Sequence, residues 1–479
     1  MVKIMQREMK HETFRRRDAC TSMSIVGMLP WLIFLLTVAV YLPALPSSFQ
    51  FDDWSVVLGD PRVSSFAAWR RSMPGMRALL KLGYALNHEL GGGVAAFRAV
   101  NILLHAMNAA MLFFLSRRLA RRIGGIGDGA AAAAGAVTAL VFALHPAQTE
   151  SVTYISGRSN ALATLWILLA LLAWLRSREK AGGWLWTLFA ASAFAAALAS
   201  KETAAVLPLV MLLCLAAEPD RPALRDFLTP AAFSALAVLL FAAAWPYLPY
   251  DYLLRASLET RGPVENLAAQ SQGVTWLIGQ MFDWARLNAD PMLQPVTQWT
   301  AGVILKTTAL AAAGVAGLLA LRRRPVPAFA ILWFFIWLAP TNSLIARLDV
   351  ANDRQLYLAL AGPAWLLGFG VARLGRYAVP AAIALSVVLA FGTAQRNRVY
   401  ATEATFWNDV VIKSPRNPRA WNNLGMAEAL DCRTEGATRA FEEAIRIAPD
   451  YLLPQMNLEL LKIGELPDLP ARCRNGGEP

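Results

Sequence analysis

The segment IVGMLPWLIFLLTVAVYLPAL, residues 25–45, is an apolar run long enough to cross a lipid bilayer as a helix. Basic residues precede it, namely Lys3, Arg7, Lys10, Arg15, Arg16 and Arg17. A cleaved signal peptide is the alternative, but the run is long for a signal core and no small-residue cleavage site follows. The segment therefore predicts a retained anchor with its N-terminus in the cytoplasm, because Lys and Arg collect on that side.

Further apolar segments follow along the chain. They lie at 96–115, 131–144, 161–175, 184–199, 204–217, 228–248, 302–321, 329–345, 356–372 and 379–394. Together with the first segment they predict an all-α, polytopic bundle of about eleven transmembrane helices. With the N-terminus inside, the dense basic clusters beside the spans all fall on the inner side, as the positive-inside rule requires. These clusters are Arg117–118 and 121–122, then Arg176, Arg178 and Lys180, Arg221 and Arg225, Arg322–324, and Arg373 with Arg376.

The composition agrees with a membrane protein. Of 479 residues, 56% are hydrophobic and only 16% are charged, against roughly 45–50% and 25% in ordinary soluble domains. This balance excludes a disordered or fibrous chain and an ordinary cytosolic enzyme. The net charge of +12 is explained by the inner loops, so we expect a lipid bilayer as partner and no nucleic acid. The richness in Ala, Leu and Arg favours a bacterial inner membrane.

We divide the chain into a cytoplasmic basic segment, 1–24, a transmembrane domain, 25–394, and an extracytoplasmic tail, 395–479. The transmembrane domain includes a first outer loop, 46–95, and an outer interfacial segment, 249–301. Within the latter, residues 274–287 are apolar but are interrupted by Gln280, Asp283 and Arg286. They predict an amphipathic helix on the outer interface. Counting them as a span would place Arg322–324 outside.

The tail has a repeating pattern. Pro415 and Pro449, Trp407 and Phe441, and Asn423 and Asn457 are each separated by 34 residues, the length of a tetratricopeptide repeat. One full repeat with flanking halves is too little for an independent solenoid. We therefore expect the tail to pack against the membrane domain or a protein partner. The tail also holds Cys432 and Cys473, which could form a disulfide or remain two free thiols.

Unusual polar residues lie at the outer ends of the spans. Each could be a helix cap, a salt bridge or an anchor. Charged groups at membrane depth are costly, however, and usually face a cavity or a partner. Several of them on one side predict a site for an anionic substrate embedded in the membrane. They are Asp52, Asp53, His145, Glu150, Arg158, Lys201, Glu202, Arg354 and Tyr357. We assign His88 and His105 to helix packing.

At these residues the chain resembles the transmembrane and tetratricopeptide-repeat O-mannosyltransferases and their bacterial relatives, in the GT-C superfamily of glycosyltransferases. The resemblance covers nearly the whole chain, in the order of the family's motifs. The matching residues are Phe51-Asp52-Asp53; Arg77, Leu79, Tyr84 and Asn87; Asn101 and His105; His145-Pro146, Thr149-Glu150 and Gly157-Arg158; Lys201-Glu202; and Trp333, Leu338-Ala339-Pro340, Asn342, Arg354 and Leu356-Tyr357-Leu358. Ala78 departs from the family's usual Pro, and the tail is shorter than in many relatives.

The resemblance implies a GT-C-like fold and an enzyme that transfers a sugar from a polyprenyl-phosphate-linked donor to a hydroxyl of a protein or glycan acceptor, with inversion. Asp52 is then the general base, and Asp53 orients the acceptor or the sugar. Cations stabilise the lipid phosphate as it leaves, in the order Arg158, Lys201, Arg354 and Arg77. The cavity is shaped by His145, Glu150, Glu202 and Tyr357. No cofactor is required, although two carboxylates could hold a divalent metal.

Two hypotheses from other functional classes are alternatives to a transferase. A transporter or flippase of a lipid-linked or anionic substrate would also place charges in a membrane cavity. No internal repeat and no pair of broken helices supports that reading. A non-catalytic membrane scaffold would use the repeat tail to bind a partner. Within the transferase reading, the acceptor could also be a lipid.

Overall fold

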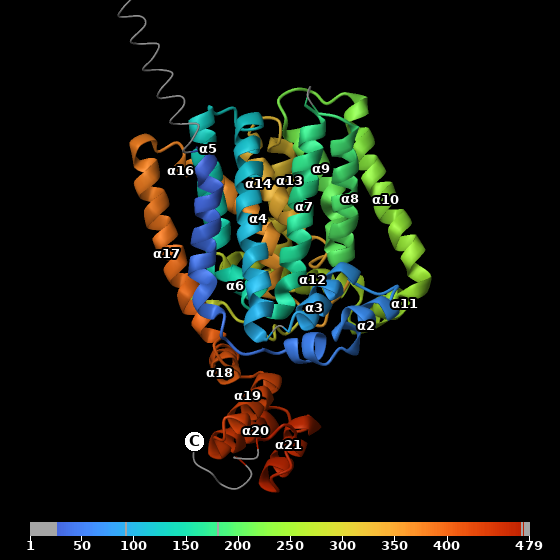
Figure 1. Cartoon of the computed structure of the whole chain (residues 1–479), viewed down its shortest axis with the longest axis vertical. Helices are drawn as coiled ribbons and strands as arrows, with labels where there is room; N and C mark the ends of the chain where they lie inside the picture. The colour runs from blue at the N-terminus through green and yellow to red at the C-terminus, as the bar shows by residue number, and fades with distance from the viewer. Residues whose placement is uncertain (1–25, 92, 180–181, 471–472, 474–479) are drawn as a thin grey trace, which may run out of the picture.

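The fold is a bundle of helices that carries a small helical tail (Figure 1). The computed structural model describes residues 26–91, 93–179, 182–470 and 473, so the predicted cytoplasmic segment 1–24 lies outside the described residues. The described residues form helices, turns and loops, with no β-strand among them. The prediction of an all-α protein is therefore confirmed.

Six helices within the described residues are long and apolar enough to cross a bilayer. They are Val26–Ala44; α4 (Val94–Arg122); Ile155–Ser177, which contains α7 (Arg158–Ser177); Leu224–Tyr247, which contains α10 (Leu228–Ala244); α13 (Ala301–Ala320); and Gly375–Val399, which contains α17 (Ala378–Val399). A seventh span arises if α5 (Asp128–Leu144) is joined to Pro146–Val152 across a 54° bend.

The other predicted spans form shorter apolar helices. These are α8 (Trp184–Ser200), α9 (Leu207–Ala217), α14 (Pro325–Leu338) and α16 (Ala361–Val371). At 1.5 Å per residue, such helices fall short of the roughly 30 Å hydrocarbon core, so the number of about eleven crossings stays a prediction. The predicted span 329–345 is too long: α14 ends at Leu338, two residues before Pro340, because the residue before a proline is disfavoured in a helix.

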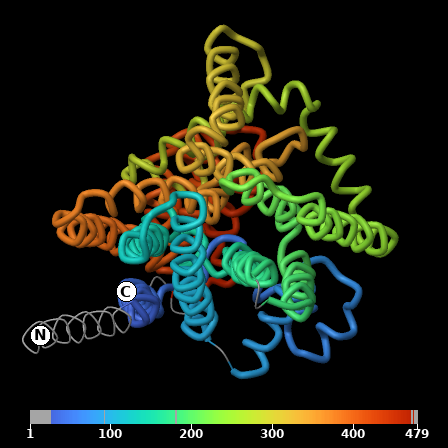
Figure 2. Tube along the Cα trace, turned by 90° about the horizontal axis from the view of Figure 1, so that it is seen from above, coloured from blue at the N-terminus to red at the C-terminus, as the bar shows by residue number. Residues whose placement is uncertain are grey.

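Small residues bring the central helices into close contact. A Cβ atom on Gly135 would lie 2.9 Å from the carbonyl oxygen of Phe113, and one on Gly368 would lie 2.5 Å from that of Ala134. These glycines allow α5 to approach α4 on one side and α16 on the other, as small residues do between membrane helices. The helices α4 and α7 are mostly buried, whereas α10, α13 and α17 are mostly exposed at the edge of the bundle (Figure 2).

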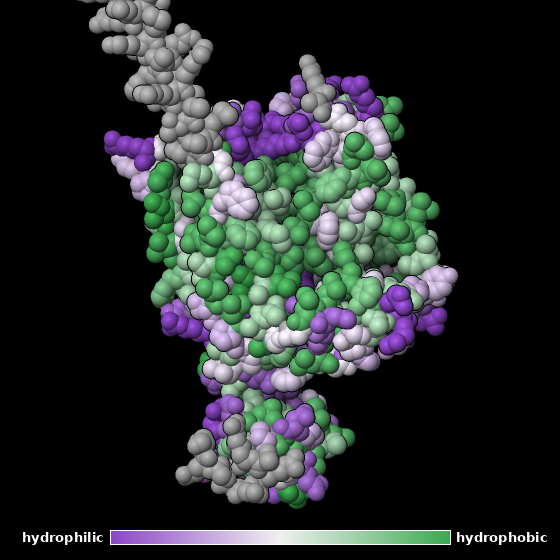
Figure 3. Space-filling view, in the orientation of Figure 1, coloured by the Kyte–Doolittle hydropathy of each residue, from purple (hydrophilic) through white to green (hydrophobic). Residues whose placement is uncertain are grey.

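A broad apolar belt covers the outside of the bundle between two polar ends (Figure 3). Trp31, Leu185, Leu239, Leu305 and Val387 are each more than half exposed. Such a continuous apolar surface would be a liability in water but suits the hydrocarbon core of a bilayer. The chain is therefore built as a multi-pass membrane protein.

The arginine clusters gather at the end of the bundle opposite the tail (Figures 1 and 3). Arg122 at the end of α4 and Arg178 after α7 both pair with Glu218, which follows α9, at 3.1 and 3.0 Å. Predicted inner clusters thus share one end of the bundle. That this end faces the cytoplasm remains a prediction.

The end of the bundle that carries the tail also holds α2 (Phe66–Arg71), α3 (Ala78–Glu89), α11 (Tyr250–Thr260) and α12 (Pro263–Gln280) (Figure 1). The helix expected at 274–287 is in fact α12, which begins earlier and ends at Gln280. It is followed by a turn in which the amide of Asp283 donates to the carbonyl of Gly279 (2.9 Å). Asn266 and Gln270 on α12 donate to the carbonyls of Ser343 and Val350 at 2.6 and 3.2 Å, so this helix supports the loop after α14.

The tail consists of α18 (Glu403–Lys413), α19 (Pro418–Leu430), α20 (Thr434–Ile447) and α21 (Leu452–Lys462). A Cβ atom on Gly425 would lie 2.5 Å from the ring of Phe441, so glycine is needed where α19 packs on α20. The amide of Asn457 donates to Asn422 (2.9 Å). Phe441 and Asn457, two positions of the repeat pattern, therefore lie at contacts between the tail helices, while the assignment to a tetratricopeptide repeat stays a prediction.

The tail is anchored on the membrane domain. Arg419 on α19 donates to both carboxylate oxygens of Asp290, with Nη2 at 2.5 Å from Oδ1. The ammonium of Lys413 donates to the carbonyl of Leu287 (2.8 Å), and the ring of Trp407 meets that of Phe51 edge-on at 5.3 Å. The same loop that carries Asp52 therefore also contacts the tail.

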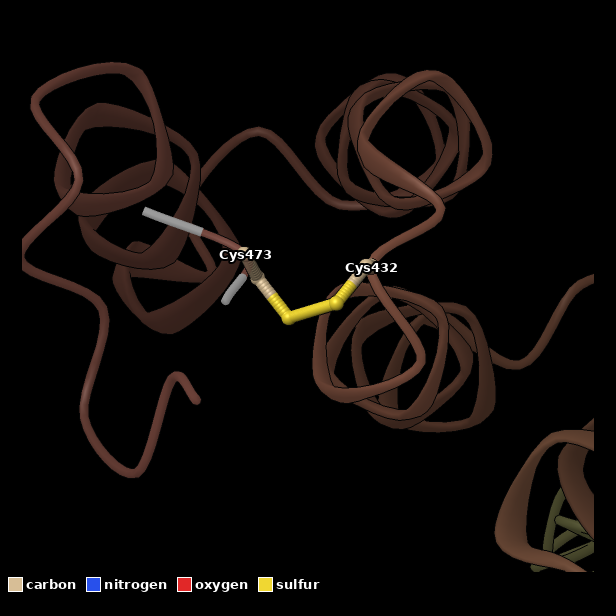
Figure 4. Close-up of a disulfide and its surroundings, with 2 residues drawn as sticks. All are labelled: Cys432 and Cys473. Atoms are coloured by element: carbon tan, nitrogen blue, oxygen red, sulfur yellow. A yellow bond between two sulfur atoms is a disulfide. The ribbon is translucent and has the colours of Figure 1, made fainter. Parts of the chain in front are cut away.

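The sequence left the pairing of Cys432 and Cys473 open, and the two cysteines form a disulfide (Figure 4). It joins the α19–α20 connection to the end of the chain across 41 residues. The third cysteine among the described residues, Cys214, is free and buried.

Replacing Cys432 and Cys473 by Ser is expected to destabilise the tail by about 4 kcal/mol, because the disulfide restricts the unfolded loop. Limited proteolysis of the full chain will show faster cleavage beyond residue 432 in the double variant, and the same change in wild type after reduction. The membrane domain should keep its resistance. Equal cleavage rates in the variant and the wild type would contradict this prediction.

Candidate functional site

A cavity of about 480 Å³ lies at the tail end of the bundle. It is lined by residues from the first outer loop, the α8–α9 connection and the segment after α14. It brings together many of the residues predicted for the site, namely Asp52, Arg77, Lys201, Glu202, Arg354 and Tyr357.

Asp52 reaches this cavity through a strained turn. Phe51 before it has a positive φ of 46°, an uncommon conformation for a residue with a side chain. The amide of Asp52 donates to the hydroxyl of Tyr154 (3.1 Å). Its carboxylate is 40% exposed, with Oδ2 at 3.8 Å from Nη1 of Arg354. Asp52 therefore presents an accessible carboxylate that is only loosely paired.

Asp53 points elsewhere. Its Oδ1 accepts hydrogen bonds from the amide and the hydroxyl of Ser156, both at 2.7 Å, and its Oδ2 accepts one from the amide of Gln50 (3.1 Å). Burial raises the pKa of Asp53 to about 6, against the opposing effect of these hydrogen bonds. Asp53 is not among the residues that line the cavity; it fastens the first outer loop to the segment before α7.

Arg158 is also placed outside the cavity lining. The side chain is 1% exposed, and its guanidinium donates to Asn87 and Asn101 at 2.7 and 2.8 Å and to the carbonyls of Gly83 and Phe97. It also lies 4.6 Å from the centre of the Tyr84 ring. Four of its five N–H donors bind protein oxygens, and the buried side chain does not line the cavity, so Arg158 is poorly placed to hold a substrate phosphate.

The remaining predicted cations do line the cavity, and two have acidic partners. Arg77 pairs with Glu202 (3.1 Å). Arg354 pairs with the buried Glu150, with Nε at 3.0 Å from Oε1. Glu150 is outside the cavity lining and contacts the cavity through Arg354; that it supports the site stays a prediction.

Lys201 is surrounded by positive charge. Its ammonium donates to the side-chain oxygen of Asn160, and no carboxylate of the described residues lies within 4.0 Å of it. Burial lowers the pKa of Lys201 well below its usual value, and the nearby Arg77, Arg347 and Arg354 lower it further. An anion bound in the cavity would relieve this repulsion.

Arg347 is a cation that sequence reasoning missed. It lines the cavity from the loop after α14 and is exposed. The predicted spans 329–345 and 356–372 leave Arg347 in a short outer loop together with Arg354, but Arg347 is not among the predicted site residues. The signal was Pro340, which ends the helix early and makes the loop long enough to fold over the cavity.

Tyr357 and His145 have supporting positions. The Tyr357 hydroxyl shares a hydrogen bond with the ring of His105 (2.8 Å) and accepts one from Asn108 (3.1 Å). His105 thus acts in packing, as expected, and fixes a residue of the cavity wall. His145 contacts the carbonyl of Met281 (3.0 Å) and lies outside the lining; it ties the α5 bend to the end of α12.

The charges of the cavity lining favour an anion. Its cations are Arg77, Lys201, Arg347 and Arg354, and its acids are Asp52 and Glu202. Apolar side chains complete the wall, including Leu253, Trp337 and Ile345. A cavity lined by both cations and apolar side chains suits an amphiphile with an anionic head.

A metal site is not evident in the part of the chain that the structure describes, where no group of three His, Cys, Asp or Glu side chains gathers. Asp52 and Asp53 face different surroundings, as their separate partners show. The adjacent acids are therefore not arranged as a shared pair of ligands.

Comparison with known proteins gives named relatives, and no family model matches the chain. It is 32% identical over 218 residues to the protein O-mannosyl-transferase Tmtc2 of Drosophila melanogaster, covering 40% of this chain and 22% of that protein. It is 23% identical over 460 residues to the human protein O-mannosyl-transferase TMTC3, covering 86% and 48%. The mouse TMTC3 protein is 24% identical, covering 89% and 52%. The chain spans about half, or less, of the length of these relatives, and the resemblance inferred from its motifs is confirmed.

Proposed function

We propose that this chain is a membrane glycosyltransferase of GT-C type that transfers a sugar from a polyprenyl-phosphate-linked donor to an acceptor hydroxyl. The observation that carries the proposal is the cavity in which the accessible carboxylate of Asp52 lies among four cations. The relatives, which are named as protein O-mannosyl-transferases, support the class of reaction and favour a Ser or Thr hydroxyl of a protein as acceptor.

In the proposed reaction, Asp52 acts on the acceptor hydroxyl and the cations of the cavity act on the donor phosphate. The carboxylate of Asp52 takes the proton of the acceptor hydroxyl while that oxygen forms a bond to the anomeric carbon. The bond from this carbon to the phosphate oxygen breaks, and its electron pair leaves with the lipid phosphate. Attack from the face opposite the phosphate inverts the anomeric configuration.

Cations assist the departure of the phosphate. Lys201 and Arg347 supply charge that no carboxylate of the described residues neutralises within 4.0 Å, and Arg354 adds a guanidinium held by Glu150. Preorganised positive charge in a partly dry site stabilises the developing phosphate charge strongly. The proposed set of phosphate-binding residues therefore differs from the one predicted from the sequence: it omits Arg158 and includes Arg347.

Topology follows the same proposal. The tail end of the bundle, with the cavity, faces the extracytoplasmic side of a bacterial inner membrane, and the arginine-rich end faces the cytoplasm. The polyprenyl chain stays in the bilayer, and the tail beside the cavity is placed to meet a protein acceptor.

The test uses the purified full chain in lipid nanodiscs with a set of polyprenyl-phosphate sugars and acceptors that include Ser/Thr peptides, glycans and lipids. We expect a glycosylated product together with an equal amount of free polyprenyl phosphate, both measured by mass spectrometry. Donor movement between leaflets without product would favour a flippase. The absence of both donor binding and product, with every donor tested, would overturn the proposal.

Replacing Lys201 by Gln is expected to raise the KM for the donor about 10- to 100-fold, because hydrogen bonds to charged groups contribute roughly 1.5–3 kcal/mol. The thermal midpoint should be unchanged or higher, since the variant no longer buries an ammonium among arginines. The matched control is Lys462→Gln, which removes a surface ammonium of the tail that pairs with Glu459 at 2.7 Å. An unchanged KM in Lys201→Gln would exclude Lys201 from the donor site.

A further inference from the structure

A second cavity, of about 800 Å³, lies at the end of the bundle opposite the proposed active site. It is formed by the last turns of α4, the loop to α5 and the end of the α7 segment. Its charged lining residues are Arg117, Arg118, Arg121, Arg122, Asp128 and Glu179. We propose that this arginine pocket binds the phosphate headgroup of an anionic phospholipid such as phosphatidylglycerol.

Arg118 and Arg122 have carboxylate partners of their own, Glu179 and Glu218, whereas Arg117 and Arg121 are incompletely neutralised. Arg117 and Arg121 both approach the same oxygen of Asp128, at 3.3 and 3.1 Å. The Nε of Arg117 is buried and has no hydrogen-bond partner among the described residues. Each guanidinium has five N–H donors, so one carboxylate oxygen leaves most of them free. A phosphate offers several acceptor oxygens and matches the planar guanidinium groups better.

A bound phosphate can readily replace Asp128 in its ion pairs with Arg117 and Arg121. The Asp128 side chain is 63% exposed, and that of Arg121 is 55% exposed. Pairs of this kind contribute only about 0–1 kcal/mol. A phosphate diester can therefore displace Asp128 at little cost and keep both arginines.

The backbone adds a weaker attraction. The helix α5 begins at Asp128, and its N-cap, Gly127, has no side chain to accept the free amide hydrogens of the first turn. Both residues line the pocket. The positive end of the 17-residue helix α5 thus faces the same space as the arginines.

An apolar contact distinguishes a lipid from free phosphate. Phe114 is 41% exposed on α4 and lines the pocket one helical turn below Arg117 and Arg118, together with Ile126. The pocket therefore has cations at the polar end of the bundle and one apolar ring, that of Phe114, toward the apolar belt. This is the order of groups along a phospholipid, and basic pockets between membrane helices commonly hold anionic headgroups.

The experiment is native mass spectrometry of the purified full chain in a neutral detergent, titrated with phosphatidylglycerol, phosphatidylcholine or inorganic phosphate. We expect one phosphatidylglycerol adduct on wild type, and about thirtyfold weaker binding in the Arg117→Gln/Arg121→Gln double variant. The matched control is Arg323→Gln/Arg376→Gln, which removes the same charge from exposed positions outside the pocket lining and should bind like wild type.

A second variant tests the proposal even if the double variant misfolds. Asp128→Asn keeps both arginines and removes their competing carboxylate, so it should bind phosphatidylglycerol about fivefold more tightly. Equal binding by the wild type, the double variant and Asp128→Asn would overturn the proposal. Displacement of the lipid by millimolar inorganic phosphate would assign the pocket to a free phosphate and would also overturn it.

Discussion

Replacing Asp52 by Asn is expected to lower the rate of sugar transfer by about 10²- to 10⁴-fold, the usual contribution of a general base. The variant keeps the shape of the side chain but cannot accept the proton of the acceptor hydroxyl. The donor affinity should stay close to wild type, because Asp52 lies 3.8 Å from Arg354 and contributes little to holding the cations. The loss should therefore fall on kcat.

The measurement is the initial rate of glycopeptide formation in nanodiscs, with donor binding measured on the same samples. Asp283→Asn is the matched control, since Asp283 is 47% exposed on the same end of the bundle and, among the described residues, forms its one ion pair with Arg286 at 2.9 Å. Asp53 is unsuitable as a control, because its carboxylate holds Ser156 and Gln50 in place. A kcat of Asp52→Asn equal to that of the control would remove Asp52 from the catalytic role.

The sequence could predict which residues share one end of the bundle. Apolar runs and basic clusters predicted the order of the helices and which loops share an end of the bundle, and Asp52, Lys201 and Arg354 line one cavity. Helix ends were less predictable: α14 ends at Leu338, before Pro340, so the loop that carries Arg347 is longer than the predicted span 329–345 implies.

The direction of each side chain could not be predicted. Asp52 and Asp53 are adjacent in the chain, and only the positive φ of Phe51 and the position of Ser156 decide which one faces the cavity. The position of a residue along the chain also does not show how many of its N–H groups are free to bind a substrate. Arg158 and Lys201 both lie at helix ends on the same side, yet among the described residues the first donates four hydrogen bonds and the second donates one.

Arg158 is therefore expected to behave as a structural residue. In Arg158→Gln, the buried oxygens of Asn87, Asn101, Gly83 and Phe97 lose their donor, and unpaired buried acceptors are costly. We expect a loss of about 3–5 kcal/mol of stability, the usual cost of breaking a buried charged network. The donor affinity of the remaining folded protein should be unchanged, the reverse of the pattern expected for Lys201→Gln.

Arg158→Lys separates the two roles further. Lysine keeps the charge, so a residue that served only as a positive charge for the donor phosphate would retain most of its effect. Lysine cannot, however, reproduce the planar fork that reaches four oxygens and stacks on Tyr84. We expect Arg158→Lys to unfold at nearly as low a temperature as Arg158→Gln in a thermal scan of the purified protein. A stable Arg158→Lys or Arg158→Gln variant with weakened donor binding would return Arg158 to the phosphate site.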